Sequence, residues 1–181
     1  KSSHRTFMLL EELLQWSNSQ SGQLKVKLKT LEIQVPINKT LSLLRGQAEH
    51  KGVDLEFSPL PNLVMVKADL AMITTVIRNF ISNAIKFTPK GGKINVEVIE
   101  GDKSIKILIV DNGIGIEEKK LERLFKVGES SISTRGTDQE QGSGFGLILC
   151  QEFINVHHGE VGVESELGKG STFWFTLPNP K

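Results

Sequence analysis

The chain has 181 residues, of which 38% are hydrophobic and 24% charged; this composition is typical of one globular domain with an appendage and excludes global disorder. Its 22 basic and 21 acidic residues leave a formal net charge of +1, which gives no electrostatic case for a nucleic-acid partner, and none is expected. No apolar run approaches the roughly 18 residues that span a bilayer, so we expect these residues to be soluble, and we expect the single cysteine, Cys150, to be a buried thiol in a reducing compartment.

The first predicted element is an amphipathic helix over residues 6–16. Its apolar residues recur at helical spacing: Phe7, Leu10, Leu13 and Leu14. The polar stretch 17–22 that follows predicts a boundary between an appendage, residues 1–22, and a main domain, residues 23–181. The helix either packs on that domain or pairs with a partner helix. Because the chain opens without methionine and almost at once in a helical pattern, we interpret it as a fragment of a longer protein.

In the main domain, apolar alternation predicts strands at residues 31–35, 53–57, 63–66, 94–99, 105–110, 160–165 and 172–177. Helices are predicted from Pro36 towards Gly52, from an Asp69 N-cap to about Phe87, at about 117–125 and at about 145–156. This order, with a hairpin at residues 101–103, predicts an α/β sandwich with helices on one face of a mixed sheet. The long polar run 126–143 lacks periodicity, which is typical of a loop with a function, such as a lid.

The segment NFISNAIKF, Asn79 to Phe87, has a polar face. Asn79, Asn83 and Lys86 lie within roughly 60° of arc on a helix that turns about 100° per residue. The opposite side is apolar: Leu70, Ile73, Ile77, Phe80, Ile81, Ala84 and Ile85. Asparagine is a mediocre helix former, and two of them four residues apart are poor choices unless their amides have partners. This face is therefore as consistent with a binding site as with a solvated surface.

Two glycine-containing segments follow. DNGIGI, Asp111 to Ile116, has the composition of a turn, but Gly113 and Gly115 would also let backbone approach a planar ligand, and Asp111 could accept from an exocyclic amine. GSGFG, residues 142–146, feeds a helix whose N-terminal N–H groups suit phosphate. Its spacing is not that of a dinucleotide fingerprint, and residues 168–172 lack the first glycine of a Walker loop.

In this order and separation, the three segments resemble the N box and the two glycine boxes of the histidine-kinase ATP-binding domain, which has the Bergerat fold of the GHKL family. The phrase from Leu124-Phe125 to GSGFGLILC and the ending GKGSTFWFTLP are similar to the kinase branch in particular. The match covers about residues 31–178. It implies a two-layer α/β (α+β) sandwich, with three main helices on one face of a mixed sheet, that binds ATP and Mg²⁺.

Carried over by position, the resemblance implies that Asn83 ligates Mg²⁺, that Asn79 supports it, and that Lys86 meets phosphate. Hard Mg²⁺, coordinated mostly by phosphate oxygens and water, suits such an amide site. Asp111 would accept from the adenine amino group. The implied base pocket is completed by Gly113, Gly115, Ile116 and Thr172. The remaining residues of the implied nucleotide site are Phe87, Gly142, Gly144, Gly146 and Leu147, the three glycines closing the lid on the phosphates. Phe125 would be a packing aromatic.

Two positions depart from the family pattern. Gln141 stands where a basic residue is frequent before the glycine box, and His158 stands where a glycine is frequent. The first would weaken a phosphate contact and the second would alter a turn. His157 and His158 end a predicted helix, where the dipole favours cations.

In this family, ATP hydrolases typically carry glutamate at the position of Asn79, and asparagine cannot accept the proton from water. Transfer to another nucleophile is therefore favoured over hydrolysis. None of the four histidines has the context of the family's phosphate acceptor, and the segment HRTFMLLEELLQWSNSQSG resembles the tail of the second helix of the acceptor hairpin. We therefore expect ATP binding without efficient self-phosphorylation.

The resemblance also implies partners: the acceptor hairpin of the same protein, a response-regulator receiver domain, and a second copy bound through the missing hairpin. It implies a cytoplasmic domain of a membrane-associated sensor. Two alternatives stay open, a GHKL serine kinase that acts as an anti-sigma factor and a nucleotide-binding pseudokinase that works through protein contacts.

Overall fold

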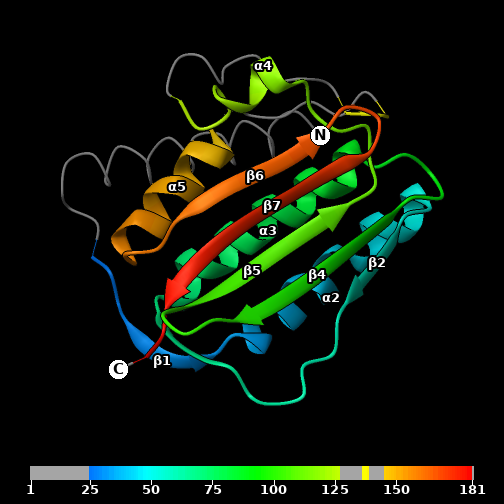
Figure 1. The fold of residues 1–181 in the computed structure, drawn as a ribbon. Coiled ribbons are helices and arrows are strands. Elements are labelled where there is room, and N and C mark those ends of the chain that lie inside the picture. Colours follow the sequence, from blue (N-terminus) through cyan, green and yellow to red (C-terminus); the bar gives the residue numbers. More distant parts are fainter. Residues whose placement is uncertain (1–24, 127–135, 139–144, 181) are drawn as a thin grey trace.

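The computed structural model describes residues 25–126, 136–138 and 145–180. Its main sheet has five strands in the order β2-β4-β5-β7-β6 (Figure 1). Their bounds are β2 Asp54–Phe57, β4 Lys93–Glu100, β5 Ser104–Asp111, β6 Val161–Glu166 and β7 Gly170–Pro178. β2 and β4 are parallel, whereas the other neighbouring strands are antiparallel. The predicted mixed sheet is therefore confirmed, including the hairpin between β4 and β5.

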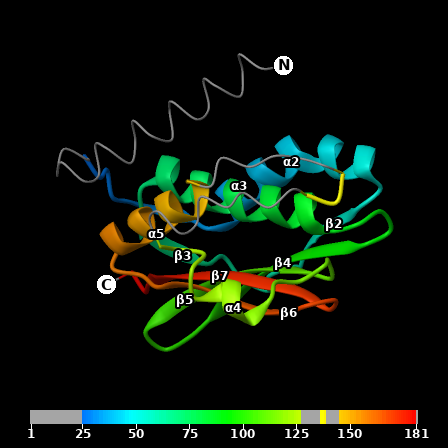
Figure 2. The same ribbon diagram turned by 90° about the horizontal axis from the view of Figure 1, so that it is seen from above.

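Three helices cover one face of this sheet: α2 Gln34–Lys51, α3 Leu70–Phe87 and α5 Gly146–Val156 (Figure 2). α3 lies between the other two and contacts both. The predicted two-layer sandwich is confirmed. Among the described residues, no helix is both long and apolar enough to cross a membrane.

The apolar side of α3 supplies the centre of the core. Phe80 is fully buried and its ring contacts those of Phe173 and Phe175 on β7, at centroid distances of 5.4 and 6.1 Å. The predicted apolar face is buried with one exception, since Leu70 in the first turn is 46% exposed. Because α3 is fixed to the sheet along one side, its opposite side is held in a defined orientation.

Asp69, at the start of α3, is hydrogen-bonded to the segment before β1 and to the residue after α5. Asp69 is the N-cap as predicted, and its Oδ1 accepts from the N–H groups of Ala71 and Met72. Its Oδ2 accepts from the backbone N–H of Lys27, and its own N–H donates to Nε2 of His157, 2.9 Å away. This geometry overturns the interpretation of His157 as a dipole-favoured cation: Nε2 accepts, so the proton is assigned to Nδ1, which contacts the Phe153 carbonyl oxygen.

A second, two-stranded sheet was not predicted. β1, Lys29–Glu32, pairs antiparallel with β3, Met65–Ala68. The strand predicted at 31–35 is therefore too late in the sequence, because α2 already begins at Gln34 and includes Val35. The physical reason is that Ile33 turns into the helix while its N–H still donates to the Val64 carbonyl oxygen.

The helix predicted at 117–125 is much shorter. α4 covers only Glu118–Leu121 and buries none of its residues. Hydrogen bonds beyond it join an N–H to the carbonyl oxygen three residues earlier, as from Arg123 to Lys120 and from Leu124 to Leu121. The α-helix stays short because none of its own residues is buried against the core to stabilise it, and tight turns carry the chain on to Leu124 and Phe125, which pack half-buried against the core.

The face of the sheet away from the helices carries Trp174 of β7. Lys106 Nζ lies 4.1 Å from the centroid of its ring. Gly162 of β6 is its cross-strand partner, and a Cβ at Gly162 would overlap the indole. The bare glycine backbone therefore makes room for the ring.

His158 has φ of +58°, so the departure from glycine at this position does fall in a turn that favours glycine. Left-handed backbone costs an L-residue about 1–2 kcal/mol. The side chain of His158 is exposed, and its backbone N–H donates to the Asn155 carbonyl oxygen.

Candidate functional site

One residue of the polar face of α3, Asn79, contacts the start of α5. Nδ2 of Asn79 lies 3.5 Å from both the Gly146 carbonyl oxygen and Cys150 Sγ. Asn83 and Lys86 lie further along α3 and are half-buried, and Lys86 Nζ is 4.6 Å from the centroid of the Phe87 ring. The structure thus brings Asn79 and Gly146 together. It also confirms that Cys150 is a buried thiol.

The first turn of α5 lacks a side-chain cap. Its N-cap residue is Phe145, which makes no capping hydrogen bond through its side chain. The first N–H groups of a helix have no intrahelical partners and carry partial positive charge, so this end can receive an anion. Gly146 and the half-buried Leu147 lie in this turn. Of the other predicted lid glycines, Gly142 and Gly144 lie outside the described residues, as does Gln141.

Asp111 ends β5 and lies at the edge of the helix-covered face, 7% exposed. Its Oδ1 accepts from the N–H groups of Gly113 at 2.8 Å and Ser171 at 3.2 Å. Burial raises the pKa of this carboxyl above its ordinary value, and the two backbone hydrogen bonds oppose that rise. Among the described residues, both hydrogen bonds to the carboxylate end on Oδ1, which leaves Oδ2 for an external donor.

The loop after Asp111 is packed backbone against backbone. A Cβ at Gly113 would overlap the carbonyl oxygen of Phe87, and one at Gly115 would overlap that of Glu166. The Ile114 N–H donates to the Phe87 carbonyl oxygen, 3.1 Å away. The loop is thereby pressed between the end of α3 and the β6–β7 turn, so the predicted close approach at both glycines is to protein backbone.

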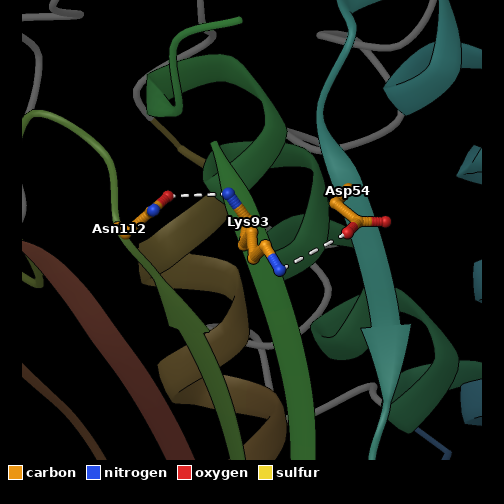
Figure 3. A network of polar contacts seen from close by, with 3 residues as sticks. All are labelled: Asp54, Lys93 and Asn112. Atoms are coloured by element: carbon orange, nitrogen blue, oxygen red, sulfur yellow. Dashed lines mark hydrogen bonds and ion pairs between the residues drawn. The ribbon is translucent and has the colours of Figure 1, made fainter. Parts of the chain in front are cut away.

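Asn112 fixes the same loop to the neighbouring strand. Its Oδ1 accepts from the N–H of Lys93 at the start of β4, at 2.7 Å (Figure 3). Lys93 Nζ in turn lies 4.0 Å from Asp54 Oδ2 on β2, an exposed pair that contributes little to stability. Asn112 therefore acts as a brace for the segment that carries Asp111.

Two serines that the sequence interpretation did not select complete this region. Ser165 Oγ accepts from the Ile116 N–H, donates to the Gly170 carbonyl oxygen and lies 2.9 Å from Ser171 Oγ. Ser171 is buried and directly opposite Asp111 across the β5–β7 pair. The alternation that buries Phe173 would have placed Ser171 on the same face.

Thr172, the predicted pocket residue, lies elsewhere. It pairs with Val110, and successive side chains of a strand point to opposite faces, so its side chain lies on the face away from the helices. Ser171, not Thr172, donates its N–H to the Asp111 carboxylate.

Part of the predicted lid is described, namely residues 136–138. The N–H and Oγ1 of Thr137 lie 3.1 and 3.2 Å from the carbonyl oxygen of Lys86. Phe125 packs half-buried against the core, as expected of a packing aromatic. The described residues contain no group of three or more His, Cys, Asp or Glu side chains that could hold a metal ion.

Substitution of Gly170 tests how closely the start of β7 packs against the backbone of Asp111. Gly170 has φ of +116°, and a Cβ there would overlap the Asp111 carbonyl oxygen; Gly168 has φ of +82° and open space around it. Gly168→Ala should therefore lower the free energy of unfolding by about 1–2 kcal/mol, through backbone strain alone. Gly170→Ala should cost at least about 2 kcal/mol more. Urea denaturation of both variants measures the difference, and equal losses would contradict the close approach.

Comparisons with known proteins agree with this geometry. Residues 68–181 match the family model described as histidine kinase-, DNA gyrase B- and HSP90-like ATPase. The adaptive-response sensory kinase SasA of Gloeothece citriformis is 34% identical over 171 residues, which cover 94% of this chain and 43% of that protein. The non-motile and phage-resistance protein of Caulobacter vibrioides is 33% identical over 94% of this chain and 20% of its own length. The chain thus spans less than half the length of these relatives.

Solved structures show the same fold. Full-length ShkA in complex with AMPPNP superposes with a TM-score of 0.84 at 25% identity, over 99% of this chain and 37% of ShkA. The chain is also similar to the histidine kinase ThkA in complex with the response regulator protein TrrA, with a TM-score of 0.77 at 22% identity, over 99% of this chain and 48% of ThkA.

Proposed function

The chain belongs to the family of histidine kinase-, DNA gyrase B- and HSP90-like ATPases, and we propose that it is the ATP-binding catalytic domain of a sensor histidine kinase. The observation that carries the proposal is that the loop after the buried carboxylate of Asp111 packs on the last residue of α3, the helix that carries Asn79 and Asn83. The Asp111 side suits a nucleobase and the α3 side suits phosphates.

At the base end, Asp111 would accept a hydrogen bond from the adenine amino group. Gly113 N–H and Ser171 N–H hold Oδ1, which fixes the carboxylate and leaves Oδ2 as the oxygen that would accept from the base. The tightly packed loop at Gly113, Gly115 and Ile116 would form the wall beside the base. The role first assigned to Thr172 passes to Ser171.

At the phosphate end, α3 and α5 present helix-dipole partial charges of opposite sign. α3 and α5 run antiparallel, since Asn79 contacts Gly146 while Asp69 contacts His157 at the other end. The C-terminal, negative end of α3 therefore lies about two turns beyond the point at which α3 meets the N-terminal, positive end of α5. A cation is favoured at the first and a phosphate at the second, which suits a metal–triphosphate pair.

The donors on α3 fit Mg²⁺. An amide oxygen is a hard ligand, and a site with few protein ligands suits a metal that is coordinated mainly by phosphate and water. Asn83 would supply that ligand, Asn79 would support it, and Lys86 would neutralise phosphate charge. When bound, Mg²⁺ would withdraw charge from the phosphate oxygens. Gly146 and Leu147 would offer their N–H groups to the triphosphate, and Phe87 would pack beside Lys86.

The chemistry would be transfer of the γ-phosphate to a histidine on a hairpin domain and relay to an aspartate of a response regulator. Asn79 has no basic group with which to accept a proton from water, so this chain would position ATP and leave reactivity to the acceptor. The relative named as a sensory kinase and the ThkA–TrrA complex support this assignment. We further propose that residues 1–22 belong to the hairpin, that the whole protein is a homodimer through it, and that this domain lies in the cytoplasm.

Two experiments test the proposal. Calorimetry of the unmutated chain with ATP should show affinity that Mg²⁺ increases; no affinity with or without Mg²⁺ would contradict nucleotide binding. Joining the chain to a helical hairpin that carries an acceptor histidine should then yield acid-labile phosphohistidine from labelled ATP, with a hairpin lacking the histidine as the control. Phosphoserine would instead indicate the anti-sigma class, and binding without transfer would indicate a pseudokinase.

A further inference from the structure

Lys51, the last residue of α2, is a buried lysine beside the last turn of α3. Only 8% of it is exposed. Its Nζ donates to the carbonyl oxygens of Ile85 and Lys86, at 2.7 Å each. None of the sequence motifs includes this residue, and it lies 28 positions before Asn79 in the chain.

The carbonyl groups at the end of α3 explain why a charged lysine side chain can be buried here. Burying an ammonium is unfavourable unless it is well hydrogen-bonded. The last four carbonyls of a helix lack intrahelical partners and carry the negative end of its dipole. Lys51 satisfies two of these carbonyls and places a positive charge at that end, next to the turn that carries Asn83 and Lys86.

The Lys86 carbonyl oxygen also accepts hydrogen bonds from two separate segments of the chain. Besides Lys51 Nζ it accepts from the N–H of Thr137 at 3.1 Å, with Thr137 Oγ1 at 3.2 Å, and that hydroxyl lies 3.4 Å from the Thr88 carbonyl oxygen. One peptide group therefore joins α2, α3 and residues 136–138. Movement of the last turn of α3 would therefore also displace the end of α2 and residues 136–138.

We propose that Lys51 is a positioning residue for the triphosphate, which rests on the proposed function. It fixes the last turn of α3, and through it Asn83 and Lys86, in the orientation that receives metal and phosphate. It also offsets the partial negative charge of carbonyls that would otherwise repel the phosphates. Lys51 acts through backbone atoms of α3: its hydrogen bonds to the Ile85 and Lys86 carbonyl oxygens lie in the turn that carries Asn83 and Lys86, whereas the loop after Asp111 meets α3 only at the Phe87 carbonyl oxygen.

The test compares two ligands that share the base but differ in phosphates. Isothermal calorimetry on the full chain measures affinity for AMPPNP with Mg²⁺ and for adenosine. Lys51→Met should weaken AMPPNP binding about 3- to 30-fold, the range for residues that modulate a site without touching its ligand, and should weaken adenosine binding much less. Lys51→Arg, which can donate to both carbonyls, should restore AMPPNP affinity. Lys39→Met, an exposed lysine on the same helix, is the matched control.

Equal losses for AMPPNP and adenosine in Lys51→Met would show a merely structural role and overturn the inference, as would unchanged affinity for both. If the unmutated chain bound neither ligand, the proposed function itself would fail, which is a distinct outcome. Thr137→Val provides an independent measurement should Lys51→Met not fold. It removes the hydroxyl from the same carbonyl, and must also weaken AMPPNP selectively; if it weakens neither ligand, or both equally, the inference is wrong.

Discussion

Replacing Asp111 with asparagine is expected to abolish adenine recognition, with ATP affinity falling at least about 100-fold. Asparagine keeps an acceptor oxygen for the N–H groups of Gly113 and Ser171, so the loop keeps its hydrogen bonds. The other side-chain atom becomes an NH₂ group, which would face the adenine amino group donor to donor. Calorimetry with ATP and with adenosine should show the loss for both ligands, because both carry the same base.

The same substitution is expected to stabilise the nucleotide-free protein at neutral pH by about 0.5–2 kcal/mol. Burial raises the pKa of Asp111 above its ordinary value of 3.8. Folding is then favoured while the carboxyl is protonated, and this contribution is lost as the pH rises through the folded-state pKa. The advantage of Asp111→Asn should therefore vanish in acid, near and below the ordinary value, and grow to a plateau as the pH rises.

Urea denaturation between acidic and neutral pH measures this difference. Asp54→Asn is the matched control, since Asp54 lies on the same sheet with a side chain that is 54% exposed; it should change neither ATP affinity nor the pH profile. A variant at position 111 that is less stable than the parent at neutral pH would contradict the assignment of Asp111 as a carboxylate kept buried for binding.

Replacing Asn83 with alanine should remove the dependence of ATP binding on Mg²⁺. Losing a polar contact to a charged group is worth roughly 1.5–3 kcal/mol, a factor of about 10 to 150 in affinity. Affinity measured in the presence of a chelator should change little, because the base and the α5 N-terminus are untouched. The fold should persist, since Asn83 is half-buried and alanine is the better helix former.

Calorimetry of Asn83→Ala with and without Mg²⁺ separates these terms. Thr75→Ala on the same helix is the control, because Thr75 Oγ1 donates only to the Ala71 carbonyl oxygen one turn back. If affinity fell equally in Mg²⁺ and in chelator, Asn83 would be a general contributor to the pocket and its role as the metal ligand would be wrong.

The sequence predicted best those elements in which a single hydrophobic period, that of a strand or that of a helix, is clear. The alternation of β5 and the amphipathic pattern of α3 are strong local signals, and each element lies within two residues of its predicted position. The site residues on these elements followed, because Asn79, Asn83 and Lys86 share a helix face and Asp111 ends a strand. Their roles in binding stay predictions.

What could not be predicted depends on contacts between distant segments. The pairing of β1 with β3 moves the first strand ahead of its predicted position, and Ser171 takes its place beside Asp111 only through the register of β5 and β7. His157 looks like a helix-end cation until the backbone of Asp69 is placed against its ring. Lys51 likewise looks like an ordinary last-turn lysine of α2, because its hydrogen bonds to α3 arise only when the two helices pack together.

Four closely packed glycines differ in the substitutions that their surroundings allow. At Gly113, Gly115 and Gly170 an added methyl would collide with a main-chain carbonyl oxygen, whereas at Gly162 it would collide with the indole of Trp174. A side chain can be exchanged for a smaller one, so positions 162 and 174 can change together as a compensating pair. Every residue has a main-chain carbonyl, so no second substitution can make room at the other three. Sequence drift can therefore repack the face around Trp174, while the loop beside Asp111 stays fixed.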